Sequence, residues 1–336
     1  MRSTSTSSSD GQALTTNDAK PYLGNIQGDI EFDTHFALQT WFNSGGKAIA
    51  LIRPLHMADL CVLMRDLPES IVVLPSGSGS NVMFRKEGFA GLVVSLGTRF
   101  NGFEVLPDNS IRVGAGAFTK DIVLKALESG FDLTFLGAIP GTIGGALANN
   151  ACFAGNGILD SFLRATIVRR DGRVETIKCG QADTVTMLRK KLKTGVIVQA
   201  VLKPERRRTA LLEEKLSRMK ALHQKTYSTE RFRTGHAFYA MQEELDSARP
   251  QLELQKAKSI IAELGDLQDA DSSLRLDSRY PNILIGEKQL DVSEIERFGE
   301  RLRGLARKKL DVELGWNIEI YGMAKDARLL QRFDPN

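Results

Sequence analysis

The sequence AIPGTIGGALANN, residues 138–150, decides how this chain is organised. Glycine has no Cβ and adopts positive φ readily, so the backbone N–H groups at Gly141, Gly144 and Gly145 can approach a ligand closely. The apolar run that follows predicts a helix, and the N-terminal end of a helix favours an anion. The stretch is therefore typical of a loop that holds a phosphate or a flat ring.

A second loop of the same kind precedes it. LPSGSGSN, residues 74–81, lies between the apolar runs 71–73 and 82–84, which predicts a Gly/Ser loop between two short strands. Hydroxyls and bare amides suit a pyrophosphate, although most such loops are plain turns. Neither loop is GxxxxGK[ST] or a strand-GxGxxG-helix unit, which argues against a P-loop or Rossmann site.

Five motifs together resemble a known family. GSGSN (77–81), VGAGA (113–117) and IPGTIGGAL (139–147) resemble the UDP-N-acetylenolpyruvoylglucosamine reductases, the flavoenzymes that make UDP-N-acetylmuramate for peptidoglycan. TWF with GG at 40–46 and LGWNIEIYG at 314–322 look like that family's opening and closing segments. The resemblance runs in family order from about residue 26 to 322.

This resemblance implies a fold and a cofactor. The fold is a two-subdomain FAD-binding fold of the vanillyl-alcohol oxidase type, α/β in character, followed by an α+β domain that covers the flavin and binds a nucleotide-sugar substrate. In the family NADPH reduces the FAD, so NADPH is a possible second cofactor. The residues expected to bind FAD are Gly77, Ser78, Gly79, Ser80, Asn81, Gly114, Gly116, Ile139, Pro140, Gly141, Thr142, Gly144, Gly145 and Ala146.

The family's reduction of an enolpyruvyl double bond builds negative charge on a carboxylate, so it needs a cation or acid and a proton donor. In the family these groups are an arginine, a glutamate and a serine. The segment ADTVTMLRKK, residues 182–191, resembles the one that carries a Tyr-Arg-x-Ser run, which places Arg189 at the arginine. Leu188 replaces the tyrosine and Lys191 the serine. Without the resemblance, Arg189 is a surface charge beside two lysines.

The catalytic serine is replaced. RTGHAFYAM, residues 233–241, stands where the family has GSxFKNP, so the serine falls on His236, or on Ala237 if the register slips by one. The family's substrate-holding Lys and Asn fall on Tyr239 and Ala240. A histidine can donate a proton near neutral pH. His236 as a loop residue without a role stays open as the alternative.

The glutamate position is also altered. The family ends in LxxE, and LGWNIEIYG places Asn317 at the acid, with Glu319 two residues further on. If both lie in one strand they share a face, about 6.6 Å apart, which is too far for an unadjusted geometry. Asn317 can form hydrogen bonds but supplies no acidic proton. Cys152 stands at a glycine of the family's NAGAYG motif, and a buried inert thiol is favoured over a reactive one.

The composition is that of an ordinary globular protein. Of 336 residues 42% are hydrophobic and 26% are charged, and the net charge of +4 does not suggest a nucleic-acid partner. Three widely spaced cysteines form no metal-ligand pattern and favour a reducing compartment. No apolar run approaches the roughly 20 residues of a membrane span. Since the Ser/Thr-rich start lacks the apolar core of a secretory signal, we expect a cytoplasmic protein. The sequence identifies no protein partner and no metal site.

Four segments are expected along the chain. Residues 1–25 are polar and predicted to be a disordered tail. An FAD-binding domain follows over 26–204, split into subdomains near 100–110, because strand and helix patterns alternate there. Residues 205–325 form the C-terminal domain and 326–336 a tail.

The patterns predict the elements within these segments. Strands are expected at 48–52, 71–74, 92–96, 111–113, 165–169, 173–177, 196–202, 282–285 and 316–320, and helices at 56–67, 120–129, 205–225, 252–264 and 293–310. Asp171-Gly172 predicts a two-residue hairpin, and Gly130 a helix C-cap.

Two functional hypotheses remain open from the sequence. In the first, the chain is an FAD-dependent oxidoreductase that acts on another substrate, or on the family's substrate with His236 as proton donor. In the second, it is a non-catalytic flavin-binding paralogue that acts by binding, for example to a partner protein. The sequence retains the motifs that bind FAD and loses the groups that serve catalysis.

Overall fold

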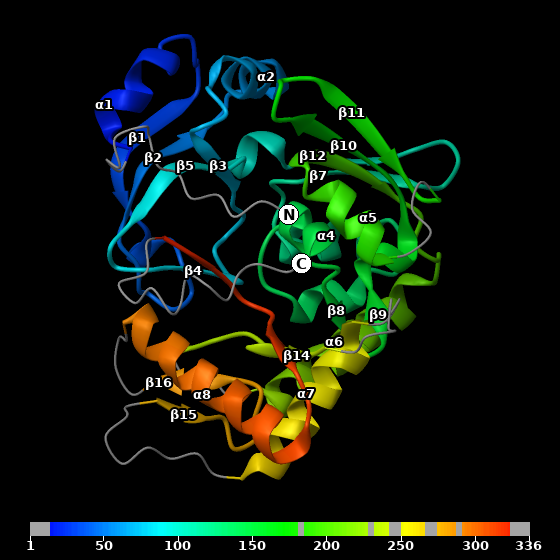
Figure 1. The fold of residues 1–336 in the computed structure, drawn as a ribbon. Coiled ribbons are helices and arrows are strands. Elements are labelled where there is room, and N and C mark those ends of the chain that lie inside the picture. The colour runs from blue at the N-terminus through cyan, green and yellow to red at the C-terminus, as the bar shows by residue number, and fades with distance from the viewer. Residues whose placement is uncertain are drawn as a thin grey trace.

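Two β-sheets lie side by side above a C-terminal part (Figure 1). The computed structural model describes residues 14–180, 185–227, 232–241, 250–265, 274–286 and 291–322. The predicted C-terminal tail and residues 1–13 of the predicted N-terminal tail lie outside these ranges. No helix in the described part is long and apolar enough to cross a membrane.

The first sheet has the strand order β1-β2-β5-β3, in which β1 pairs antiparallel with β2 and the other pairs are parallel. Five consecutive residues of β2 are buried, as expected for a strand with both faces covered. Helix α2 connects β2 to β3, close to its predicted range. The bounds are β1 Asp29–His35, β2 Lys47–Arg53, α2 Met57–Asp66, β3 Val72–Pro75, β4 Val82–Phe84 and β5 Phe89–Val94, with a short 3₁₀ helix η2 at Phe36–Leu38.

The segment 14–25, which the sequence predicts to be part of a disordered tail, is folded instead. It forms α1 (Thr16–Ala19) and η1 (Lys20–Tyr22), and Ala19 and Leu23 are buried in the main core. The sequence does not predict this burial, because the segment has few apolar residues. Their contacts are with residues far away in the chain.

A buried carboxylate fixes the chain that leads out of this segment. Asp59 in α2 is 3% exposed and accepts the backbone N–H groups of Gln27, Gly28 and Leu55 at 2.8–2.9 Å. Three such bonds satisfy a buried carboxylate and hold the segment against α2.

The second sheet has the order β11-β10-β12-β7-β6, with every pair antiparallel. The predicted hairpin is confirmed, because β10 and β11 pair and Gly172 has φ +79°. Its loop has three residues, 170–172, and not the predicted two, since Arg169 N–H bonds to the Arg173 oxygen. The bounds are β6 Phe103–Val105, β7 Ile111–Gly114, β10 Phe162–Arg169, β11 Val174–Lys178 and β12 Gly195–Leu202.

Helices pack against this second sheet and carry its loops. Helix α3 ends as predicted, with Gly130 at φ +76°. Helix α4 begins at the glycine-rich stretch, where the Thr142 hydroxyl accepts the N–H of Gly145 at 3.4 Å. The bounds are η3 Gly97–Phe100, α3 Thr119–Glu128, η4 Thr134–Ala138, α4 Ile143–Ala148, β8 Cys152–Phe153, β9 Asn156–Gly157, η5 Ile158–Ser161 and α5 Val185–Leu192.

The C-terminal part has a core of its own, built mainly from α7, α8 and short strands. The helix expected after residue 204 is α6, and its Leu212 and Leu216 are buried in the main core instead. Helix α6 therefore links the two cores. The bounds are α6 Thr209–Thr226, β13 Phe232–Arg233, β14 Phe238–Ala240, α7 Pro250–Leu264, β15 Leu274–Leu276, β16 Leu284–Gly286, α8 Val292–Leu310, β17 Leu314–Trp316 and β18 Glu319–Tyr321.

The prediction of one strand over 316–320 is wrong, because the strand is interrupted at Asn317 and Ile318. Strand β17 pairs antiparallel with β14 of the C-terminal part, and β18 pairs parallel with β4 beside the first sheet. Asn317 causes the break: its backbone N–H bonds to the Ala237 oxygen and its side chain to the His236 oxygen. The last strand, red in Figure 1, thus carries the chain back to the N-terminal part.

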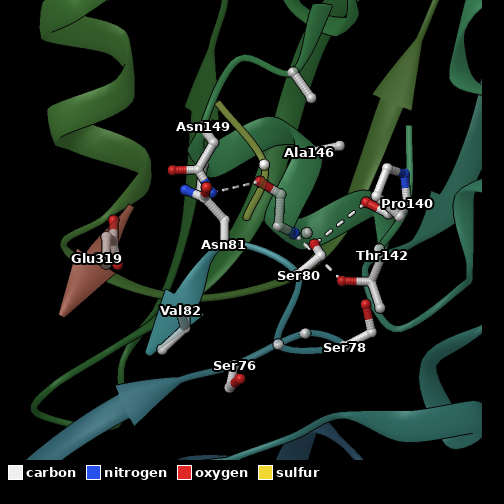
Figure 2. Close-up of a pocket in the computed structure, with 18 of the residues that line it drawn as sticks. Ser76, Ser78, Ser80, Asn81, Val82, Pro140, Thr142, Ala146, Asn149 and Glu319 are labelled. Carbon is white, nitrogen blue, oxygen red and sulfur yellow. Dashed lines mark hydrogen bonds between the residues drawn. The ribbon is translucent and has the colours of Figure 1, made fainter. Parts of the chain in front are cut away.

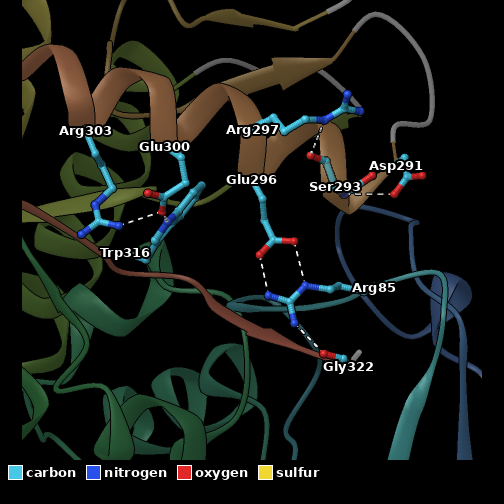
Figure 3. Close-up of polar contacts among 9 residues, drawn as sticks. All are labelled: Arg85, Asp291, Ser293, Glu296, Arg297, Glu300, Arg303, Trp316 and Gly322. Atoms are coloured by element: carbon cyan, nitrogen blue, oxygen red, sulfur yellow. Dashed lines mark hydrogen bonds and ion pairs between the residues drawn. The ribbon is translucent and has the colours of Figure 1, made fainter. Parts of the chain in front are cut away.

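A buried ion pair fastens this connection. Arg85 follows β4 and donates to both carboxylate oxygens of Glu296 in α8, at 2.8 and 2.6 Å, while its third nitrogen donates to the Gly322 oxygen (Figure 3). The two side chains are 6% and 3% exposed. The bidentate geometry satisfies both charges in a dry interface between the first sheet and the C-terminal part.

Candidate functional site

A cavity of about 1040 Å³ lies where the two sheets and the C-terminal part meet. The loops 74–81 and 138–146 form one side, which we call the glycine–serine half. The end of α6, residues 233–241 and residues 316–319 form the other side, the C-terminal half. Every residue predicted to bind cofactor except Gly114 lines this cavity, and so do both predicted catalytic residues, Arg189 and His236.

The two predicted loops face each other across the glycine–serine half. Ser80 Oγ lies 3.4 Å from the Pro140 oxygen, and a Cβ added at Gly77 would lie 2.5 Å from Thr142 Oγ1 (Figure 2). Gly141 has φ +120°, and a Cβ there would come within 3.2 Å of Ser80 Oγ. Glycine is therefore needed on both loops to bring the hydroxyls and N–H groups this close.

Gly79 and the VGAGA glycines serve close backbone packing. Gly79 has φ +65°, and a Cβ there would lie 2.1 Å from the Gln39 oxygen. A Cβ at Gly116 would lie 2.2 Å from the Gly97 oxygen, and one at Gly114 2.0 Å from the Phe100 oxygen. The structure thus places Gly114 behind the cavity wall, where it lets β7 approach η3.

Among the described residues, two polar atoms of the cavity wall have no hydrogen-bond partner. They are Ser78 Oγ and Asn150 Oδ1, and both are buried. Asn150 ends the stretch AIPGTIGGALANN and has φ +45°. Buried polar groups are ordinarily paired, so unpaired ones in a cavity wall indicate a place where a polar ligand binds.

Aromatic and imidazole side chains form the C-terminal half. His236 Nε2 lies 3.0 Å from the Tyr227 hydroxyl, and its ring stacks on Tyr280 at 4.9 Å between centroids, with 17° between the planes. His223 lies one helical turn before Tyr227 on α6, with ring centroids 4.8 Å apart. His236, Tyr227 and His223 line the cavity.

The surroundings of His236 keep its imidazole neutral. Burial, followed by the charges of Arg233 and His223, lowers the pKa of His236 to about 4. Burial also raises the pKa of Tyr227, so its hydroxyl keeps its proton near neutral pH. The proton available at this position belongs to a neutral hydrogen-bonded pair and not to an imidazolium.

Asn317, at the family's glutamate position, has a structural role. Its side-chain Nδ2 donates to the backbone oxygen of His236 at 2.9 Å, and its backbone oxygen accepts from Asn81 Nδ2 at 2.8 Å. Glu319 lies beyond the chain break, where it pairs with Lys193 and accepts the Tyr321 hydroxyl at 2.7 Å. Burial raises the pKa of Glu319, but Lys193, the Tyr321 hydroxyl and Arg189 together outweigh burial and lower the pKa below its ordinary value. Glu319 is thus a carboxylate and supplies no proton near neutral pH.

Helix α5 and the residue that follows it, Lys193, present two cations to the cavity. Leu188 and Leu192 of α5 are buried in the main core, and Arg189 and Lys193 line the cavity. Arg189 Nε donates to the Ala148 oxygen, and Lys193 Nζ to Asn149 Oδ1, both at 3.4 Å. Sequence reasoning found Arg189 but missed Lys193, although its i+4 spacing places it on the same helical face. Residues 182–184 of the predicted motif lie outside the described ranges.

Cys152, also at the cavity wall, is an unreactive thiol. Burial raises its pKa to about 11, so the thiol stays protonated near neutral pH. The neighbouring Phe153 packs its ring 6.0 Å from His223 and 6.2 Å from Tyr227. Phe153 therefore closes the cavity between the two halves with an apolar surface.

The described part of the cavity wall is basic. Four cationic side chains and two carboxylates among the described residues line it: Arg53, Arg189, Lys193, Arg233, Glu253 and Glu319. This excess of positive charge favours an anionic ligand. Within the described ranges, no group of three or more His, Cys, Asp or Glu side chains is arranged to hold a metal ion.

Comparisons with known proteins agree with this geometry. Residues 48–178 match the FAD binding domain family. The chain is 31% identical over 307 residues to UDP-N-acetylenolpyruvoylglucosamine reductase of Acidiphilium cryptum, covering 91% of this chain and 96% of that protein. It is 29% identical over 309 residues to the same reductase of Jannaschia sp., covering 90% and 97%. The crystal structure of UDP-N-acetylenolpyruvylglucosamine reductase from Thermus caldophilus has the same fold, with TM-score 0.65 and 18% identity over 88% of this chain and 100% of that chain.

Proposed function

The chain belongs to the UDP-N-acetylenolpyruvoylglucosamine reductase family, and on that premise we propose that it is an FAD-dependent oxidoreductase with a rebuilt substrate side. FAD is its cofactor. The observation that carries the proposal is the contrast within one cavity. Its glycine–serine half keeps the family motifs, and its C-terminal half has His236 and Asn317 at the positions of the family's serine and glutamate.

The residues of the glycine–serine half fit FAD. The close approach of the two loops leaves N–H groups and hydroxyls on a surface that any Cβ at Gly77 or Gly141 would obstruct. The unpartnered Ser78 hydroxyl is placed to donate to a phosphate oxygen, and the Asn150 oxygen to accept from a ring N–H. FAD supplies hydride transfer when bound, and the loops 77–81 and 139–146 are proposed to hold it.

The substrate side is proposed to work with other groups than the family uses. Arg189 is the cation that stabilises negative charge on the substrate. The proton donor is the pair formed by Tyr227 and His236, since the phenol keeps its proton and the neutral imidazole orients it at 3.0 Å.

Substrate binding is also proposed to differ. The relatives are named for a nucleotide-sugar substrate, and the family's Lys and Asn anchors fall on Tyr239 and Ala240 here. Loss of one transition-state donor costs about 10²- to 10³-fold in rate. We therefore expect a different anionic substrate, or weak activity on the family's own.

An anaerobic titration of the FAD-loaded protein tests this proposal. NADPH is added first and UDP-N-acetylglucosamine enolpyruvate second, while visible absorption is followed. We expect NADPH to bleach the flavin, and the substrate to restore the oxidised spectrum more slowly in Tyr227→Phe and His236→Gln than in the wild type. Bleaching at unchanged rate in these variants is the internal control. A flavin that NADPH leaves oxidised contradicts the proposal.

A non-catalytic flavin-binding paralogue is the second candidate. It is favoured by the joint replacement of the serine, the glutamate and both substrate anchors by His236, Asn317, Tyr239 and Ala240. In that case FAD binds, NADPH leaves the flavin oxidised, and the protein acts through a partner. The same titration separates the two candidates at its first step.

A further inference from the structure

Two cations, Arg189 in α5 and Lys193 directly after it, face a single carboxylate from the C-terminal half. Lys193 pairs with Glu319, and Arg189 contributes to holding the Glu319 carboxylate ionised. Figure 2 shows Glu319 on the same side of the cavity as Asn149, and Lys193 donates to both. A protein carboxylate therefore already lies against cations that line the ligand cavity.

The ion pair contributes little as a structural link. The side chains of Lys193 and Glu319 are 39% and 33% exposed, and ion pairs this accessible stabilise a fold only weakly. Lys193 also has a second acceptor in Asn149 Oδ1. Because Leu188 and Leu192 anchor α5 in the core, Lys193 stays at the cavity when Glu319 releases it.

Glu319 differs from Glu296 in this respect. The Arg85–Glu296 pair is almost fully buried and bidentate, whereas the Lys193–Glu319 pair is single and open to the cavity. A ligand carboxylate can replace Glu319 on Lys193 at little cost, because Glu319 keeps the Tyr321 hydroxyl as a donor and is accessible to water. The arrangement is that of a carboxylate-binding site in which Glu319 competes with the carboxylate of the ligand.

We propose that Lys193 is a substrate-binding residue of this chain, which together with Arg189 holds a carboxylate of the substrate after that carboxylate has displaced Glu319. As in the family's reaction, this carboxylate lies beside the double bond that is reduced. This inference rests on the proposed function, since it places the reducible group of the substrate in the same cavity. Replacement of the family's substrate-binding Lys and Asn removes part of the anion binding. Lys193 is a fixed cation that restores some of it.

Binding of crotonate to the FAD-loaded full-length protein tests the inference. Crotonamide has the same shape without the charge and is the matched ligand control. The two tryptophans of the chain, Trp41 and Trp316, both line the cavity, so their fluorescence reports binding independently of flavin reduction. We expect saturable quenching with crotonate and none with crotonamide over the same range.

Opposite effects of two variants distinguish a displaceable counter-ion from a structural ion pair. Lys193→Met removes the ligand's cation and is expected to raise the crotonate Kd about tenfold, as for loss of one charged contact. Glu319→Gln removes the competitor and is expected to lower the Kd several-fold. Lys190→Met, an exposed lysine of α5 outside the cavity, is expected to leave the Kd unchanged.

The outcomes separate this inference from the proposed function. If NADPH bleaches the flavin but crotonate does not bind, or both variants shift its Kd in the same direction, the carboxylate site is refuted and the oxidoreductase proposal stands. If crotonate binds with the expected opposite shifts but NADPH leaves the flavin oxidised, the oxidoreductase proposal fails and the anion site stands.

Discussion

The two halves of the cavity depend on different parts of the chain. In the glycine–serine half the backbone makes the site, because Gly79 and Gly141 have conformations and contacts that only glycine allows. In the C-terminal half side-chain groups make the site, through His236, Tyr227 and Glu319. A backbone site tolerates no replacement at its glycines, whereas a side-chain site can exchange one functional group for another. The comparison gives a physical reason for the contrast on which the proposed function rests, in which the cofactor motifs persist and the catalytic groups differ.

The largest effect is expected from breaking the buried ion pair of Arg85 and Glu296, which joins the N-terminal and C-terminal parts. We expect Glu296→Ala to lower the free energy of unfolding by about 3–5 kcal/mol, because it leaves the Arg85 guanidinium buried without its counter-charge. Urea denaturation followed by tryptophan fluorescence measures the change.

The exposed pair of Arg307 and Glu313 supplies the matched control for this prediction. Its side chains are 76% and 49% exposed, so Glu313→Ala is expected to change stability by less than about 1 kcal/mol. The double variant Arg85→Met/Glu296→Leu is expected to recover most of the loss, since it removes both charges. Equal effects of Glu296→Ala and Glu313→Ala would contradict the assignment.

A single methyl group on the Gly/Ser loop should disturb the glycine–serine half. Gly79→Ala places a Cβ 2.1 Å from the Gln39 oxygen at φ +65°, and we expect FAD to bind at least about tenfold more weakly, equivalent to about 1.4 kcal/mol. Isothermal titration of the apoprotein with FAD measures this. Gly180→Ala is the control, since Gly180 has φ +84° but open space around it, away from the cavity. The same FAD affinity in both variants would show that the loop adapts.

Local patterns predicted most of the fold. The apolar run of β2, the helical spacing of α2 and the Asp171-Gly172 turn lie close to where the sequence predicts them. These signals are local, since each depends on residues that are neighbours in the chain. The break between β17 and β18 was missed because each strand has its own partner, β14 for one and β4 for the other.

The same distinction applies to the site. That the residues of the glycine–serine half lie together was predictable because their motifs are contiguous, and Lys193 could have been found from its i+4 spacing to Arg189. Tyr227 gave no signal, since its role depends on His236, which the fold brings within 3.0 Å. Gly114 was assigned to the cofactor on its motif alone, and only the contact with Phe100 shows its packing role.

Acidic pH should disturb the C-terminal half through His236. Its folded pKa of about 4 lies below that of an unfolded histidine, about 6.5, so the unfolded chain binds the proton first. Stability is therefore lost as pH falls from about 6.5 towards 4, by at most about tenfold in the folding constant per pH unit. Arg233, His223, Tyr227 and Tyr280 surround the ring and do not relieve this.

Replacement of the histidine isolates this effect from the titration of other groups. His236→Gln keeps a hydrogen-bonding partner for Tyr227 and cannot titrate, so its urea midpoint should fall less between pH 7 and 5 than that of the wild type. His35→Gln, at an exposed position on β1, should behave as the wild type. If His236→Gln and His35→Gln have the same pH profile, His236 is protonated without penalty in the folded protein.

The smallest effect concerns a buried hydroxyl of the glycine–serine half. Ser78 Oγ has no hydrogen-bond partner among the described residues, so Ser78→Ala should leave the stability of the apoprotein unchanged or slightly raised. The same change should weaken FAD binding by about 1 kcal/mol, a factor of about five, if the hydroxyl donates to the cofactor. Ser129→Ala, which removes a hydroxyl that bonds to the Lys125 oxygen away from the cavity, should leave FAD affinity unchanged. Weaker binding without loss of stability would show that side chains also contribute to the backbone site, whereas unchanged binding would show that the backbone alone holds the cofactor there.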